Sequence, residues 1–165
     1  RDWGLEHGME WIQWTYDPLL VINANLNIHR LGAIASKYFE NYYGVMDGIN
    51  TGTPSDRILA EWYLRSPRVL ACLNHSDNEN RNTQEMEVNS IRENSPDVEF
   101  FDAEAAIIRI NLPNDFNQLV MDNVSLALEW RLHIRRLLQN YFSRDYYISG
   151  FTFKDGPAYL LEKNI

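Results

Sequence analysis

Two spacings of hydrophobic residues run along this chain, and the first is the alternation that is typical of strands. Residues 9–16 are rich in aromatic and β-branched side chains and stop at Asp17-Pro18, which predicts a strand followed by a turn. Residues 57–64 predict a further strand, and residues 105–112 predict another that Pro113 ends. The same signals predict a strand at residues 68–73. They also predict a hairpin at the end of the chain, which pairs residues 146–153 with residues 157–163.

The second spacing is helical and is clearest at residues 125–144. Apolar side chains recur there at three- and four-residue intervals, at Leu126, Trp130, Ile134, Leu137, Leu138 and Tyr141. This pattern predicts one long amphipathic helix that packs its apolar face on a sheet. Arg131, Arg135 and Arg136 fall mostly off that face, so we expect them in solvent, with a site for an anion as the alternative.

Shorter segments fill the rest of the chain. Residues 5–8 predict a helix that ends at a glycine, and residues 23–33 predict a short helix that Asn23 caps and Gly32 ends. The other expected segments are a strand at 34–43, a glycine-rich loop at 47–55, a long polar surface excursion at 74–97 and the start of a helix at 116–121.

These elements predict an α/β fold of the α+β type, with a mixed, largely antiparallel sheet flanked by helices. The length of 165 residues is that of one ordinary domain. We expect it in two parts, residues 1–66 and a C-terminal α/β extension over residues 67–165, packed as one unit.

Composition excludes several classes of function. The formal net charge of −8 argues against nucleic acid as a partner, because phosphate backbones are bound through clustered Lys and Arg. No apolar run approaches the roughly 20 residues that span a bilayer, so we expect no membrane partner. The single cysteine, Cys72, lies in an apolar run, which indicates a small buried side chain in a reducing, cytoplasmic setting. The four histidines have no metal-ligand spacing, so we expect no metal site.

Several short stretches resemble one branch of a known superfamily. They are Trp14-Thr15-Tyr16-Asp17-Pro18-Leu19, Asn23-Ala24, Arg30-Leu31-Gly32-Ala33, Tyr42-Tyr43-Gly44, Pro54-Ser55-Asp56-Arg57 and Glu61-Trp62. Together they resemble a poorly characterised group of predicted acetyltransferases in the GNAT superfamily of acyl-CoA N-acyltransferases. The order helix, glycine, strand, short helix, strand, loop, strand is similar to the second half of that fold. Residues 126–131 and the end of the chain resemble the C-terminal extension of the group.

The resemblance implies transfer of an acyl group, usually acetyl, from coenzyme A to a small-molecule or peptide amine. It implies that the strand with Trp14 and Thr15 borders the thioester of acetyl-CoA, and that Asn23 and Asn27 contact the cofactor. The alternatives are that Asn23 is a helix cap and Asn27 an exposed helical residue. The carboxylates nearest the expected cleft, and therefore the candidate general bases, are Asp17 and Glu61. Asp17 is also a good turn starter, and Glu61 is also a candidate for the solvent side of an alternating strand.

Two departures from the superfamily's pattern define a second hypothesis. The Arg/Gln-x-x-Gly-x-Gly/Ala loop, which directs backbone N–H groups at the cofactor's pyrophosphate, is not in this sequence. Ile28 stands where many of these enzymes place a proton-donating tyrosine, and the adjacent His29 faces about 100° away on the helix. The alternative function is a non-catalytic module that binds a partner protein or an acyl-CoA. We also expect an exposed sheet edge that a missing N-terminal half or a second copy of the chain would cover.

Overall fold

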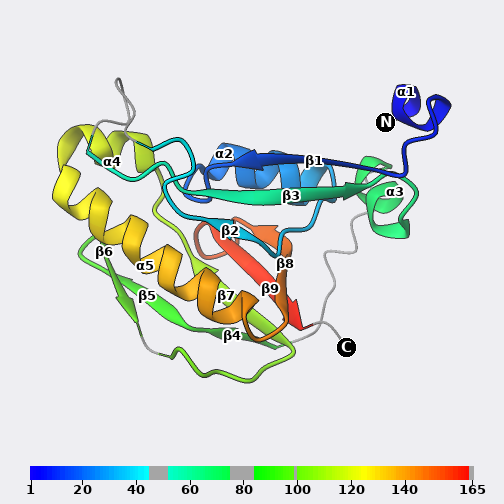
Figure 1. Ribbon diagram of the computed structural model, residues 1–165. Coiled ribbons are helices and arrows are strands. Elements are labelled where there is room, and N and C mark those ends of the chain that lie inside the picture. The colour runs from blue at the N-terminus through cyan, green and yellow to red at the C-terminus, as the bar shows by residue number, and fades with distance from the viewer. Residues whose placement is uncertain (45–51, 75–83, 99, 164–165) are drawn as a thin grey trace.

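The computed structural model describes residues 1–44, 52–74, 84–98 and 100–163, and these form a mixed α+β fold (Figure 1). The expected loop at 47–55 and the expected excursion at 74–97 therefore lie partly outside the described residues. In the described ranges no helix combines the length and the apolar character needed to cross a membrane.

The first sheet is antiparallel and has the strand order β1-β3-β2. It contains β1 (Trp11–Tyr16), β3 (Arg57–Tyr63) and β2 (Tyr38–Phe39). β1 ends where the sequence predicts, because Asp17 accepts a hydrogen bond from the backbone N–H of Leu19 and so turns the chain. β1 is an edge strand, with β3 as its neighbour among the described residues.

The second sheet has the order β4-β7-β9-β8 and is antiparallel except for the pair β4–β7. Its strands are β4 (Glu85–Glu87), β7 (Ile107–Asn111), β9 (Ala158–Lys163) and β8 (Tyr146–Thr152). The strand predicted at 105–112 and the terminal hairpin are therefore confirmed. A separate hairpin pairs β5 (Asn89–Arg92) with β6 (Ser95–Val98), so the described end of the polar region at 74–97 forms three short strands.

Ile34 and Ala35 connect the two sheets. The N–H of Ile34 donates to the Glu61 carbonyl on β3, and the N–H of Ala35 donates to the Ile148 carbonyl on β8. The strand predicted at 34–43 is thus only partly present, as these two bridges and the two residues of β2.

The short helices differ most from expectation. α1 (Asp2–Glu6) ends before Gly8 as predicted, and α2 (Val21–Ala24) continues into the π-helical segment η1 (Asn25–Arg30). Gly32 follows with a φ of +74°, and a Cβ there would lie 3.1 Å from the Cα of Val69, so glycine is required.

The strand predicted at 68–73 is wrong, because α3 (Pro67–Leu73) is a helix. The Ser66 side chain accepts a hydrogen bond from the Val69 N–H, and Pro67 occupies the first helical position, where its missing N–H costs nothing. Cys72 lies on this helix and is half-buried.

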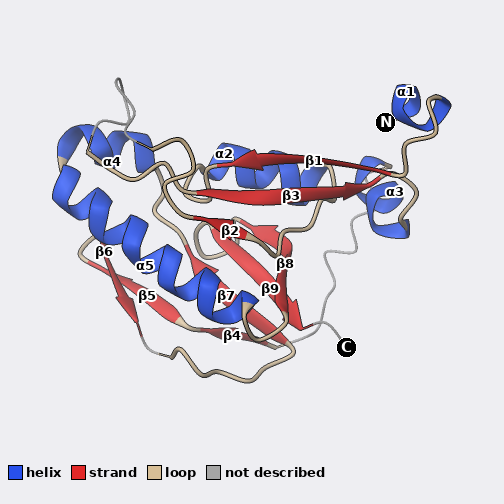
Figure 2. Cartoon of the chain, viewed as in Figure 1, coloured by secondary structure: helices blue, strands red, loops and turns tan. Residues whose placement is uncertain are grey.

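Two consecutive helices lie in the second part of the chain, α4 (Phe116–Asp122) and α5 (Val124–Phe142). α5 confirms the helix predicted at 125–144 and packs against β6, β8 and β2, while η1 packs against β8 and α3 (Figure 2). One cluster of buried side chains includes Ile28 and Ile58 from the first part of the chain and Trp130, Leu137 and Leu161 from the second. The core is therefore continuous across residue 66.

Candidate functional site

Glu61 occupies the centre of one face of the β1–β3 ladder. Alternate side chains of a strand share a face, and the register places Gln13 opposite Glu61 and Trp11 opposite Tyr63. Glu61 is only 8% exposed, so it does not lie on a simple solvent side of the strand. The Gln13 amide donates to its Oε1 at 3.0 Å, and the Ser36 hydroxyl donates to its Oε2 at 3.3 Å.

The charge of this carboxylate is not balanced by a cation within the described residues, where no ion pair includes Glu61. Neutral donors hold it, and Gln13 and Ser36 each use one lone pair, so both oxygens keep a lone pair for a further donor. The carboxylate of Glu61 also acts on Tyr63. Burial raises the pKa of the Tyr63 phenol, and the nearby negative charge of Glu61 raises it further.

An aromatic pair borders Glu61 on the same face. The rings of Trp11 and Tyr63 are stacked, with centroids 6.0 Å apart and planes 11° apart. They are 47% and 43% exposed, so the stacked pair forms one continuous apolar surface open to solvent. The face therefore combines a fixed carboxylate with an open aromatic surface.

Asp17, the other candidate base, is fully engaged in structural contacts. Arg131 donates to its two oxygens at 2.6 and 2.7 Å, and Arg57 approaches at 3.4 Å. The Leu19 N–H also donates to Oδ1, so the carboxylate has no free position for a substrate proton. The turn at Asp17-Pro18 is present, and in this conformation Asp17 is not available as a base.

A second pair of the same kind lies one helical turn further along α5. Arg135 donates to the two oxygens of Asp56 at 2.8 and 2.7 Å, and the Tyr38 hydroxyl donates to the same carboxylate at 2.6 Å. Burial disfavours ionisation of Asp56, but Arg135, the Asn41 N–H and Tyr38 outweigh it and hold its pKa below the usual value.

The expectation that the α5 arginines lie in solvent is therefore wrong for two of the three. Arg131 is buried and Arg135 largely so, whereas Arg136 is exposed. Their partners are Asp17 and Asp56 of this chain, so the alternative of an external anion at Arg131 and Arg135 has no support either.

The residues expected to contact the cofactor divide between the two faces of the first sheet. Trp14 lies on the face opposite Glu61, where its indole N–H donates to Asn27 Oδ1 at 3.2 Å. Thr15, half-buried, alternates with Trp14 and so shares the face of Glu61. The structure thus brings together Trp14 with Asn27, and Thr15 with Glu61.

The two asparagines do not have their expected structural roles. Asn23 lies inside α2, whose N-cap is Leu20, so the cap interpretation is wrong. Asn27 is buried rather than exposed, and it lies in η1. A π-helical turn of this kind is frequent at functional sites. Ile28 is completely buried in the core, and its aliphatic side chain has no proton to donate.

Sequence reasoning missed Gln13, Ser36 and Arg131. Gln13 is opposite Glu61 only in the observed register, and no local pattern points to Ser36 or to the pairing of Arg131 with Asp17. The described residues hold no group of three or more His, Cys, Asp or Glu side chains arranged to bind a metal ion. Comparisons with protein-family models, with curated proteins and with solved structures give no match.

Proposed function

We propose that this chain forms part of an acyl-CoA-dependent N-acyltransferase in which Glu61 is the general base. The observation on which the proposal depends is the state of Glu61: a buried carboxylate held by Gln13 and Ser36, with no cation beside it in the described residues. A base must keep an accessible lone pair, and Glu61 does so where Asp17 does not.

The order of elements also supports this proposal. α1, Gly8, β1, the helix that ends at Leu31-Gly32, β2 and β3 follow one another as in the second half of the GNAT fold. The superfamily's pyrophosphate loop is not in this sequence, so the proposal assigns no pyrophosphate contact to these residues.

In the proposed reaction a neutral amine attacks the thioester carbonyl of an acyl-CoA. A C–N bond forms and the C–S bond breaks. Glu61 takes the proton from the amine nitrogen and then releases it to solvent, and the departing thiolate takes up a proton from solvent. The edge of β1 that has no partner strand among the described residues would supply backbone N–H groups for the oxyanion, which is the electrostatic contribution that such a site needs. Trp14 and Asn27 lie on the other face of β1, where they would contact the arm of the cofactor.

Nuclear magnetic resonance titration with acetyl-CoA tests the binding part of the proposal. We expect millimolar acetyl-CoA to shift the amide signals of β1 and the indole signal of Trp14. The indole of Trp3, which lies on α1 and stacks on His7, provides the internal control. Uniform absence of shifts in β1 at millimolar acetyl-CoA would contradict the proposal.

A non-catalytic binding module is the second candidate. The exposed Trp11–Tyr63 pair favours it, because it lies beside the edge of β1 that no strand of the described ranges covers. Exposed edge strands pair readily with an extended peptide, and alternate side chains then give specificity. Release of free thiol separates the two functions. A binding module would bind acetyl-CoA or a peptide at β1 but would not release thiol when an amine is added. The enzyme would release thiol when an amine is added, and the Glu61→Gln variant would not.

A further inference from the structure

A groove between α5 and the β5–β6 hairpin lies apart from Glu61 and plays no part in the proposed reaction. One of the residues that line this groove, His133, is held by a buried side-chain amide. Asn89, completely buried on β5, accepts a 2.7 Å hydrogen bond from the backbone N–H of Asn111. Because an N–H group only donates, the atom of Asn89 that faces it is the oxygen. The Asn89 NH₂ group therefore points the other way, toward the Asn111 carbonyl and His133.

This orientation fixes the proton on His133. The Asn89 amide donates to its Nε2 at 3.1 Å, so Nε2 is the acceptor and the proton is on Nδ1. Burial, and then the positive charge of Arg136, lower the pKa of His133 to about 4. The ring is thus neutral at pH 7 and offers one N–H donor. Among the described residues, His133 Nδ1 has no hydrogen-bond partner. It is also not one of the unpaired polar atoms that the protein shields completely from solvent.

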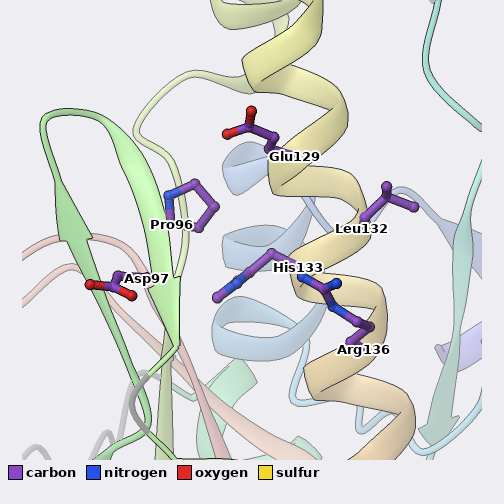
Figure 3. A pocket seen from close by; sticks show the side chains of 6 residues that line it. All are labelled: Pro96, Asp97, Glu129, Leu132, His133 and Arg136. Atoms are coloured by element: carbon purple, nitrogen blue, oxygen red, sulfur yellow. The ribbon is translucent and has the colours of Figure 1, made fainter.

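His133 lines a cavity of about 440 Å³, within the usual range for small-molecule sites. Figure 3 shows that Arg136 extends along α5 so that its guanidinium lies beside the His133 ring. The other lining residues are Pro96, Asp97, Glu129 and Leu132.

The charges around this cavity are of both signs. In the described part of the chain Arg136 and Glu129 form no ion pair with each other or with other residues, while Asp97 pairs with Arg92 at 3.2 Å. Two carboxylates in one groove disfavour a dianion such as phosphate, and Arg136 disfavours a simple cation. A ligand with one negative and one positive group satisfies both sides, and Leu132 and Pro96 provide an apolar wall.

We propose that this groove binds a small zwitterion of the α-amino acid type with an apolar side chain. Its carboxylate accepts from the His133 Nδ1–H and the Arg136 guanidinium, its ammonium group donates to Glu129, and its side chain lies along Leu132. The Asn89–Asn111 pair makes the site rigid, because it holds the His133 ring in one tautomer and one orientation.

Titration of ¹⁵N-labelled protein with L-leucine, followed at the imidazole nitrogens of His133, tests this site. We expect a saturable shift at Nδ1, weaker binding of acetate and of methylammonium, and no displacement of leucine by inorganic phosphate. Arg136→Gln should weaken leucine binding by about 10-fold or more, since hydrogen bonds to charged groups are the strong ones. Glu129→Gln should weaken leucine binding but leave acetate binding unchanged.

Arg65→Gln is the matched control, because Arg65 is equally exposed and lies outside the groove. It should bind leucine as the unaltered protein does. Arg136 and Glu129 are both exposed, so their variants should fold normally, which melting temperature checks. The proposal is overturned if the His133 signals do not saturate with leucine, if Arg136→Gln binds it equally well, or if phosphate competes with it.

Discussion

Arg131 of α5 and Asp17 at the end of β1 are 114 positions apart in sequence, and their side chains form two hydrogen bonds of 2.6 and 2.7 Å. The guanidinium also lies 4.6 Å above the ring centroid of Phe116. With the similar pair of Asp56 and Arg135, it connects the long helix to the end of the ladder where β1 stops and β3 begins. The second part of the chain thus fixes the β1–α2 junction, which begins four residues after Gln13, the partner of Glu61 in the register.

Breaking this buried pair should destabilise the protein strongly. Asp17→Asn leaves the Arg131 charge in the core without its carboxylate, and we expect a loss of about 3–5 kcal/mol in the free energy of unfolding. Denaturant unfolding measures it. The double variant Asp17→Leu, Arg131→Met should lose less, because no unpaired charge remains. Asp2→Asn breaks an exposed pair with Arg1 and should cost about 1 kcal/mol or less. Equal losses in the buried and the exposed variant would contradict this account.

Local periodicity was enough to predict the elements that pack through one face. β1, β3, β7 and α5 lie within a few residues of their predicted bounds, because a strand or helix with one apolar face keeps its period. The helix α3 differs from the predicted strand because a short apolar run such as 68–73 fits a strand or a helix equally well, and Ser66-Pro67 before it decides between them. The same two residues are a helix N-cap and a first helical residue.

The contacts of the candidate site could not be predicted in the same way. The apolar spacing of α5 implies one buried face, but this helix contacts β6, β8 and β2, so Arg131 and Arg135 are enclosed as well. For Glu61, alternation gives the face of the strand but not what covers it. The burial of Glu61 depends on Ser36 and Gln13, which only the pairing of strands brings near.

Replacing Asn23 by Ala separates cofactor binding from folding. Asn23 lies inside α2 and caps nothing, and Ala is the better helix former, so stability should stay equal or rise by up to about 0.7 kcal/mol. If its side chain contacts acyl-CoA, the dissociation constant should rise, with a loss of about 0.5–1.5 kcal/mol in the binding free energy. Thermal unfolding and calorimetric titration of the same variant give both numbers. Unchanged affinity would remove Asn23 from the cofactor site.

Glu61→Gln should lower the pKa of Tyr63 while leaving the fold intact. The carboxylate contributes, after burial, to the raised pKa of this phenol, and an amide of the same shape removes the charge. Ultraviolet titration of the tyrosines in the variant and the unaltered protein, or a ¹³C-tyrosine signal, measures the difference. Glu10→Gln, an exposed residue just before β1, is the control and should leave Tyr63 unchanged. No shift in Glu61→Gln would mean that the carboxylate does not face Tyr63 in solution.

His133 should make stability depend on pH in the acidic range. Its pKa is about 4 in the folded protein against 6.5 for an ordinary histidine, so below pH 6.5 the unfolded chain binds a proton that the folded chain does not. Its contribution is fully present above pH 6.5 and is lost as the pH falls toward 4, by up to about 1.4 kcal/mol per pH unit.

The carboxylates also titrate between pH 6.5 and 4. The contribution of His133 is therefore measured as the difference in the free energy of unfolding between the unaltered protein and the His133→Gln variant. Gln at position 133 can still accept the Asn89 hydrogen bond through its carbonyl, but it does not titrate. The free energy of unfolding, measured by urea denaturation at several pH values, should fall more steeply in the unaltered protein than in His133→Gln. Parallel curves between pH 6.5 and 4 would mean that His133 is protonated in the folded state, and the orientation of the Asn89 amide would then have to be reversed.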